Sequence, residues 1–160
     1  MQKLNILCVD DQREILAALK KDLQVFSGPF SIIDCESASE AGEVLEELDR
    51  SGKPIALIIC DHVMPEKSGI DFLIEINNDA RFVAVKKLLL TGLANHQDTI
   101  TAINRAEIDR YVEKPWNIDE LVETVKVLVT EFILETGIEY GSIQDLLHQQ
   151  TLYKALHKRG

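Results

Sequence analysis

Short apolar runs alternate along the chain with longer segments in which apolar residues recur at helical spacing. The runs number five, and this alternation is typical of repeated βα units built on a parallel sheet. The clearest run, Ile55 to Cys60, is continuously apolar, as expected of a central parallel strand covered by helices on both faces. We therefore expect an α/β fold with a five-stranded parallel sheet of the (βα)5 type.

The same two periodicities locate the remaining elements. Further strands are expected at residues 4–9, 31–35, 85–90 and 108–112. Helices are expected at residues 15–26, 38–50, 70–76, 98–106 and from just after Pro115 to about Thr136, where Gly137 supplies a stop.

Beyond Gly137 the chain continues past what the sheet needs. Five apolar residues there fit one short amphipathic helix: Ile143, Leu146, Leu147, Tyr153 and Leu156. We expect one domain over residues 1–136 and, over 137–160, a C-terminal helical extension or the start of a linker to an absent output domain.

The helix expected after Pro115 carries more apolar surface than packing on one sheet face requires. Either the whole stripe serves the core alone, or its excess surface makes a dimer or output-domain contact or is covered by the 142–157 segment folding back over it. Trp116, at the start of this helix, either covers the helix end or belongs to a partner-facing surface.

The charge of the chain limits the possible partners. Formal net charge is -10, from 17 basic and 27 acidic residues, and the acidity lies in residues 1–136. This disfavours contacts with a phosphate backbone, so direct binding of nucleic acid is not expected. The N-terminus has no long apolar run, and we expect neither a signal peptide nor a membrane span, and a cytoplasmic location.

Reactive and charged groups follow four of the five expected strands. Asp10 and Asp11 follow the first strand, Asp61 the third, Thr91 the fourth and Lys114 the fifth. In an open α/β sheet the functional crevice lies outside the carboxyl ends of the strands, where these groups converge. Converging carboxylates repel one another unless a cation neutralises them, and all-oxygen ligation favours Mg²⁺.

These side chains also suit phosphoryl transfer. A carboxylate such as Asp61 can form an acyl phosphate, Lys114 can pair with phosphoryl oxygens, and Thr91 can hydrogen-bond one of them. Any one of these residues alone is more often a cap or a solvated turn residue, but their conjunction favours a site. Cys8, Cys35 and Cys60 lie in or beside apolar runs without Cys-x-x-Cys spacing, so we expect reduced, buried thiols.

Four motifs resemble the receiver domain of bacterial two-component response regulators, over roughly residues 3 to 130. They are Val9-Asp10-Asp11, Asp61-His62-Val63-Met64-Pro65 with Gly69, Leu90-Thr91-Gly92, and Tyr111-Val112-Glu113-Lys114-Pro115. The resemblance implies a flavodoxin-like sheet of strand order 2-1-3-4-5, the order for which the chemotaxis member of this family is a standard example. Residues 1–136 are thereby identified as a receiver domain.

The resemblance also implies roles for individual residues. Asp61 would accept the phosphoryl group from a histidine kinase or phosphotransfer protein, and Asp11, Asp61 and the Val63 backbone carbonyl would bind Mg²⁺ with help from Asp10. Thr91 and Lys114 would contact the phosphoryl group. Tyr111 would be the switch aromatic, moving inward as Thr91 is drawn toward the phosphate.

The implied function is a signalling switch whose chemistry is limited to self-phosphorylation and self-dephosphorylation. Apolar Val63 and Leu93 flank the site where polar residues are common in the family, which suggests altered, slow dephosphorylation. A homodimer through the strand 4/5 face or the C-terminal helices is left open.

Two other readings compete with this function. A phosphatase of the haloacid dehalogenase type also uses an Asp nucleophile and Mg²⁺, but its Asp-x-Asp motif should follow the first strand, where Asp10-Asp11-Gln12 stands. A pseudo-receiver would act only as an interaction module. The full set of acidic residues with Thr91 and Lys114 argues against it.

Overall fold

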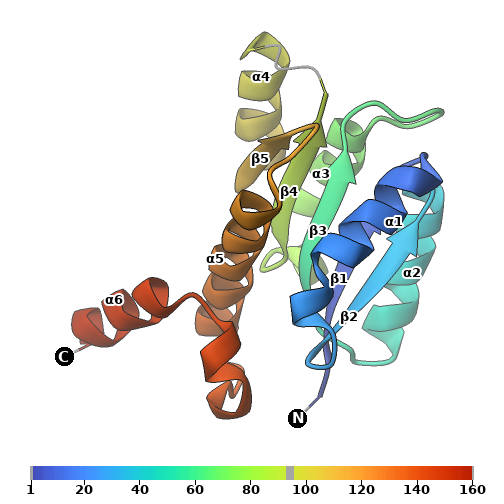
Figure 1. Cartoon of the computed structure of the whole chain (residues 1–160). Helices are drawn as coiled ribbons and strands as arrows, with labels where there is room; N and C mark the ends of the chain where they lie inside the picture. Colours follow the sequence, from blue (N-terminus) through green and yellow to red (C-terminus); the bar gives the residue numbers. More distant parts are fainter. Residues whose placement is uncertain (1, 93–95, 160) are drawn as a thin grey trace.

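A parallel five-stranded sheet with helices on both faces forms the body of the molecule (Figure 1). The computed structural model describes residues 2–92 and 96–159. The strand order is β2-β1-β3-β4-β5 and each neighbouring pair is parallel. The expected α/β fold and the strand order implied by the resemblance are therefore confirmed.

The bounds of the elements agree with the expected ones to within a few residues. The strands are β1 (Leu4–Val9), β2 (Phe30–Cys35), β3 (Ile55–Asp61), β4 (Lys86–Thr91) and β5 (Arg110–Glu113). The α-helices are α1 (Arg13–Asp22), α2 (Ala38–Arg50), α3 (Gly69–Asn77), α4 (His96–Ala106), α5 (Ile118–Thr136) and α6 (Gln149–Arg159). Three 3-10 helices, η1 (Gln24–Phe26), η2 (Ala80–Phe82) and η3 (Gly141–Leu146), connect them.

Burial explains why the strands differ in sequence. Every residue of β1, β3 and β4 is buried, whereas β2 and β5 form the edges of the sheet and are partly exposed. The strand expected at 108–112 begins two residues later than the pattern suggests. Ile108 is buried just before β5, and the next residue, Asp109, is held against β4 because its carboxylate accepts from the Lys87 backbone N–H at 2.7 Å.

The sheet separates two apolar cores. Residues of α1 and α5 pack on one face of the sheet, together with part of the C-terminal extension. Residues of α2, α3 and α4 pack on the other face. Since both faces are covered, the functional groups at the carboxyl ends of the strands are held on a rigid base.

Helix ends follow the expected chemistry. The side chains of Ser37, Ser68 and Asn117 accept hydrogen bonds from backbone N–H groups at the starts of α2, α3 and α5. α5 ends at Gly137 in the left-handed conformation, with φ of 73°, as the sequence predicts. The Lys114–Pro115 peptide bond, just before α5, is cis.

All three cysteines are free and buried, as expected. Burial is the main cause that raises the pKa of the Cys35 thiol to about 12 and raises the pKa of Cys8 and Cys60 further. None of them therefore exposes a thiolate at neutral pH.

The C-terminal extension packs on α5. Ile143, Leu147 and Leu152 are buried in the core that includes the outward side of α5. The backbone N–H of His148 donates to the hydroxyl of Thr130 at 2.9 Å, and its imidazole Nε2 lies 2.7 Å from Glu123. The extension therefore folds back over α5 and covers part of the apolar surface that the sheet leaves exposed on this helix.

The extra C-terminal helical segment is confirmed, but it is not one continuous helix. The segment divides into η3 and α6, because Leu147 is extended and the backbone of His148 bonds to Thr130 instead of continuing a helix. His148 then caps α6, since its Nδ1 accepts from the Thr151 backbone N–H at 3.3 Å. Tyr153 and Leu156, farther along α6, are exposed.

Trp116 covers the start of α5. Its ring is half-buried against the core beneath α1 and α5, and its indole N–H donates to the Asp22 carboxylate at the end of α1, at 2.8 Å. Among the described residues, no helix combines the length and hydropathy needed to cross a bilayer.

We expect the substitution Leu128→Ala to destabilise the protein by about 2–5 kcal/mol, because Leu128 is fully buried where α5, the sheet and the extension meet. Urea unfolding measures this difference. Val83→Ala is the matched control, since Val83 is 72% exposed, and its effect should stay within about 0.5 kcal/mol. A similar small effect for both variants would contradict the packing described.

Candidate functional site

The ends of four neighbouring strands bring the predicted site residues together. Asp10 and Asp11 follow β1, Asp61 is the last residue of β3, Thr91 is the last residue of β4, and Lys114 follows β5. Because β1, β3, β4 and β5 are adjacent and parallel, these five residues lie together at the carboxyl ends of the strands, at the upper end of the sheet in Figure 1.

Lys114 links the two sides of the site. Its ammonium group donates to Asp10 Oδ2 at 2.8 Å and to Asp61 Oδ1 at 2.9 Å. Its backbone N–H donates to the carbonyl of Thr91 at 2.8 Å, so both its main chain and its side chain are fixed. The lysine side chain is 17% exposed, which leaves the two ion pairs poorly screened by solvent.

A third carboxylate, that of Asp11, lies beside the two that pair with this ammonium. Oxygens of Asp10, Asp11 and Asp61 all lie within 4.8 Å of one another. Asp10 is fully buried and its Oδ1 accepts from the Gln12 backbone N–H at 2.8 Å, whereas Asp11 is exposed. The pocket therefore carries an excess of negative charge that one lysine does not neutralise.

This excess charge perturbs the titration of Asp61. Burial raises the pKa of Asp61, repulsion from Asp10 and Asp11 adds to it, and the hydrogen bond from Lys114 opposes the rise without cancelling it. For Lys114 burial alone would lower the pKa, but its hydrogen bonds to Asp10 and Asp61 reverse the sign and raise it. Asp61 is thus a destabilised carboxylate beside a firmly charged lysine.

The donor set fits a hard divalent cation. The three side chains offer only carboxylate oxygens, which Mg²⁺ prefers, and their excess charge is what such an ion would neutralise. Val63 lies two residues beyond Asp61 in the loop between β3 and α3, with its side chain 61% exposed. Its carbonyl as a further ligand stays a prediction.

Thr91 and Tyr111 lie on the neighbouring strands. Thr91 is 2% exposed and pairs in register with Glu113, while Asp61 pairs with Leu90. Tyr111 is 46% exposed and lines a groove of about 910 Å³ between β5 and the first half of α5. The ring is thus outside the core, and space lies beside it.

Gly69 has a role that its place in the motif did not explain. A Cβ at this position would overlap the backbone carbonyl of Asp61 and press against Cys60 Sγ. The Gly69 N–H also donates to the His62 carbonyl at 2.9 Å, which closes the loop between β3 and α3. The absence of a side chain therefore lets α3 start directly against the main chain of Asp61.

Two residues outside the acidic pocket complete the picture. The imidazole of His148 is only 17% exposed, bonds to Glu123 and caps α6. Leu93, which was paired with Val63 in the dephosphorylation hypothesis, lies outside the described residues. That hypothesis stays a prediction.

Gly69→Ala should destabilise the protein by about 1–3 kcal/mol, because the added methyl group forces the Asp61 main chain to move. Gly42→Ala is the matched control. Gly42 lies within α2 where a Cβ meets nothing within 4 Å, so alanine should stabilise by about 0.5–1 kcal/mol through helix propensity. Urea unfolding of both variants is the measurement, and a stabilising Gly69→Ala would refute the close approach.

In EDTA at pH 7 to 8, Asp61→Asn should raise the free energy of unfolding by about 1 kcal/mol, the usual gain when unfavourable charge at a functional site is removed. The pKa of Asp61 is higher in the folded than in the unfolded protein, so the folded state binds more protons and wild-type stability falls as pH rises. The difference between variant and wild type should accordingly shrink as pH is lowered below about 4, the ordinary pKa of an aspartate, because Asp61 then becomes protonated in both states.

Urea unfolding at several pH values between these limits provides the measurement. Added Mg²⁺ serves as the control, since an ion bound by the carboxylates should stabilise wild type more than the variant. A variant less stable than wild type at pH 8 in EDTA would contradict the charge excess.

Comparison with known proteins places this geometry in a family. The model of the response regulator receiver domain matches residues 6–126. The hydrogenase transcriptional regulatory protein HoxA of Cupriavidus necator is 30% identical over 128 residues, which cover 80% of this chain and 24% of HoxA. The chain thus spans about a quarter of the length of this curated relative.

Solved structures agree with the sequence match. The signal receiver domain of an HD domain-containing protein from Pseudomonas fluorescens Pf-5 has a TM-score of 0.74 at 26% identity, covering 87% of this chain and 96% of that one. A CheY-like receiver domain protein from Methanospirillum hungatei has a TM-score of 0.71 at 27% identity, covering 84% and 99%. Since the family model spans well over half of the residues, the chain belongs to the response regulator receiver domain family, whose members act as phosphoacceptors in signalling.

Proposed function

We propose that Asp61 is the phosphoacceptor and that a phosphohistidine on a histidine kinase or phosphotransfer protein is the donor. The observation that carries this is the bridge from Lys114 to both Asp10 and Asp61 inside a pocket with excess negative charge. A carboxylate whose charged form is destabilised by burial and by neighbouring carboxylates is suited to attack phosphorus.

In the proposed reaction an oxygen of Asp61 bonds to phosphorus while the bond from phosphorus to the donor imidazole breaks. The product is an acyl phosphate on Asp61, and the imidazole leaves with the electrons of the broken bond and takes a proton from solvent. Lys114 moves its ammonium contact from the Asp61 carboxylate to a phosphoryl oxygen while keeping Asp10 as a partner.

Asp10, Asp11 and Asp61, with the Val63 carbonyl, would hold Mg²⁺. When bound, the ion would neutralise charge on the transferred group. Asp10 would also orient Lys114, because it is fully buried and pairs with the lysine at 2.8 Å.

The switch would run through Thr91 and Tyr111. The Thr91 hydroxyl donates a hydrogen bond to the phosphoryl group, and Thr91 is thereby drawn toward Asp61. This movement of Thr91 leaves space on the side of β5. Tyr111, half-exposed at the groove beside α5, then turns inward. Two orientations of one ring give the two-state element that a switch requires.

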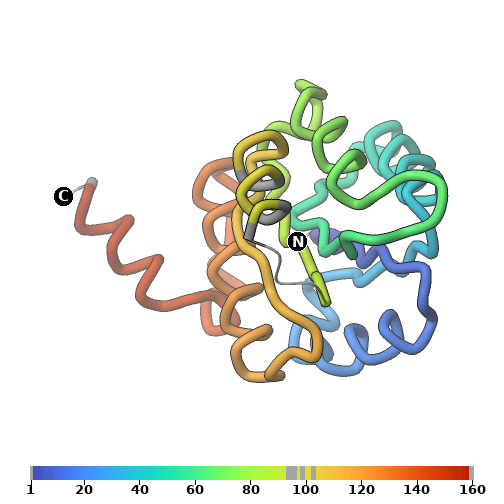
Figure 2. Tube along the Cα trace, turned by 90° about the horizontal axis from the view of Figure 1, so that it is seen from above, coloured from blue at the N-terminus to red at the C-terminus, as the bar shows by residue number. Residues whose placement is uncertain are grey.

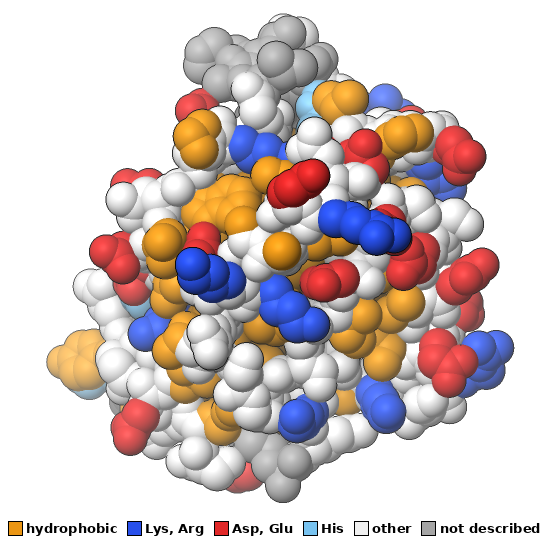
Figure 3. Space-filling view, turned by 45° about the vertical axis from the view of Figure 1, so that its right-hand side comes forward, with side chains coloured by type: hydrophobic (Ala, Val, Ile, Leu, Met, Phe, Trp, Pro, Cys, Tyr) orange, Lys and Arg blue, Asp and Glu red, His pale blue; other side chains and the backbone are white. Residues whose placement is uncertain are grey.

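Residues 1–136 would form the receiver and residues 137–160 an extension that signals to a partner or to an output domain elsewhere. Because the chain carries a net charge of -10, contact with DNA would belong to such an output. On the face drawn in Figure 3 acidic and basic side chains are interspersed, so this face offers no uniform basic field. A cytoplasmic location is part of the proposal, because the kinases of such systems phosphorylate their regulators there.

Incubation with acetyl phosphate and Mg²⁺ should add one phosphoryl group to the protein, as measured by intact mass. Asp61→Asn should abolish the gain, and EDTA should reduce it by about 100-fold or more, since positioning and charge neutralisation dominate phosphoryl transfer. Asp71→Asn is a matched control, because Asp71 is an exposed carboxylate in the first turn of α3. Absence of any gain in wild type would favour the pseudo-receiver.

A further inference from the structure

α6 leaves the body of the molecule. Its first turns are tied to α5 through His148 and buried Leu152, and the helix then points away from the sheet (Figures 1 and 2). The later turns of α6 lie beyond the rest of the molecule. An isolated helix of 11 residues is marginal in water, so the projecting part of α6 gains stability only from a further contact.

The projecting part carries an apolar stripe that the other described residues leave exposed. Tyr153 is 61% exposed and Leu156 is 60% exposed, and they lie three residues apart on one side of the helix. The Tyr153 ring stacks on His157 at 4.0 Å between centroids, which extends the flat surface of the stripe.

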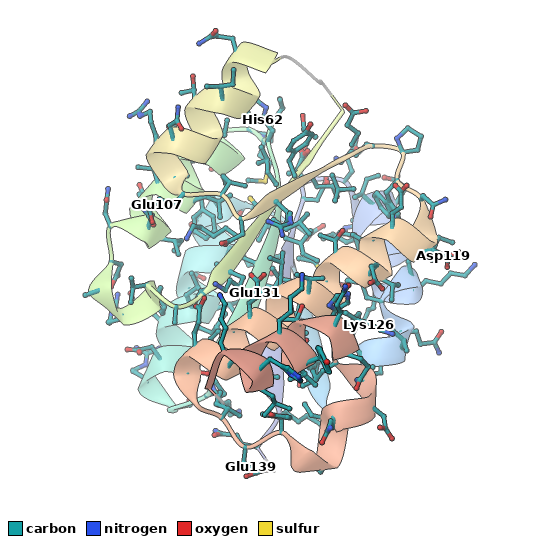
Figure 4. The ribbon with its side chains drawn as sticks, turned by 90° about the vertical axis from the view of Figure 1, so that its left-hand side faces the viewer. His62, Glu107, Asp119, Lys126, Glu131 and Glu139 are labelled. Carbon is teal, nitrogen blue, oxygen red and sulfur yellow. The ribbon has the colours of Figure 1, made fainter. Side chains whose placement is uncertain are left out.

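The corner between α5 and α6 is hollow. A groove of about 660 Å³ lies there, with Val127, Leu134 and Ala155 supplying apolar lining and Glu131 and Lys154 supplying charge. Figure 4 shows Glu131 and Lys126 on α5, the helix from which α6 projects. Tyr153 of the stripe also lines this groove, so the groove and the stripe belong to one continuous surface.

The charges of the two helices are complementary. α5 contains five acidic residues and one basic residue, whereas α6 contains three basic residues and none that is acidic. Within the described part of the chain, Glu131, Lys154 and Lys158 form no ion pair. These three charged side chains can therefore pair with opposite charges on a second molecule.

We propose that the chain forms a symmetric homodimer in which α6 of each copy occupies the groove between α5 and α6 of the other copy. A surface that holds both the stripe and its receptor groove is self-complementary, which is the requirement of a two-fold interface. Tyr153 and Leu156 would fill the apolar groove of the partner, and Lys154 would face the partner's Glu131. A lipid surface is disfavoured as the occupant, because the rest of the chain is strongly acidic and would be repelled by anionic headgroups.

Sedimentation velocity of the whole chain tests this arrangement. Wild type should be dimeric at about 100 µM, and the double substitution Tyr153→Glu with Leu156→Glu should weaken association by about 100-fold or more. Val25→Glu is the matched control, because Val25 is an exposed apolar residue in η1, far from α6, and should leave the dimer intact. Far-UV circular dichroism checks that each variant stays folded.

A charge exchange gives the decisive result. Glu131→Lys and Lys154→Glu should each weaken association by about tenfold, because each places like charges across the interface. An equimolar mixture of the two variants should restore it, since in the mixed dimer both cross-chain pairs again carry opposite charge. A contact within one chain cannot produce this rescue.

Three results would overturn the proposal. They are a wild type that is monomeric at about 100 µM, a dimer indifferent to the changes in α6, and a mixture of the two charge variants that associates no better than either variant alone. Binding of monomeric wild type to vesicles of anionic lipid, lost in the Tyr153 and Leu156 double variant, would assign the stripe to a membrane surface instead.

Discussion

The pairing of Lys114 with Asp10 and Asp61 is the interaction on which the site depends. It joins Lys114 to Asp10, which is 104 positions away in the chain, and to Asp61, which is 53 positions away. The three residues meet only because the strands that carry them are parallel and end on the same side of the sheet. The lysine nevertheless compensates only part of the negative charge around it. A folded protein that keeps such an imbalance is poised to accept a cation and a charged group, and that readiness is obtained at the expense of stability.

Much of this could be read from the sequence, for identifiable reasons. Buried parallel strands are continuous apolar runs, so Ile55 to Cys60 marked the central strand and the carboxylate that follows it. The order of strands came from a resemblance and not from periodicity, because apolar runs carry no information about which strands are neighbours. The distances between Lys114 and the two carboxylates were likewise beyond the sequence, since they depend on side-chain conformation.

The extension is helical as expected, but its division into η3 and α6 could not be read from the sequence. Its apolar residues fit one helix by spacing, yet Tyr153 and Leu156 point to solvent and Leu147 to the core. The cause is Thr130, a buried polar residue of α5 whose hydroxyl accepts from the His148 backbone and donates to the Lys126 carbonyl at 2.6 Å. A tertiary hydrogen bond thereby overrides local periodicity, and nothing in the spacing of the apolar residues could indicate it. Gly69 is a second position that local sequence does not explain. Glycine is required there because a Cβ would overlap the backbone of Asp61, eight residues earlier in the chain.

The burial of Cys8, Cys35 and Cys60 also has a practical side. Their thiols are shielded by packing and their ionisation is suppressed, so thiol reagents applied to the native protein would react with them slowly. A cysteine engineered on the surface, for example in the projecting half of α6, would carry a fluorophore or spin label selectively while the natural cysteines stay in place. The molecule is therefore already suited to distance measurements by resonance energy transfer or paired spin labels, without a prior cysteine-free background.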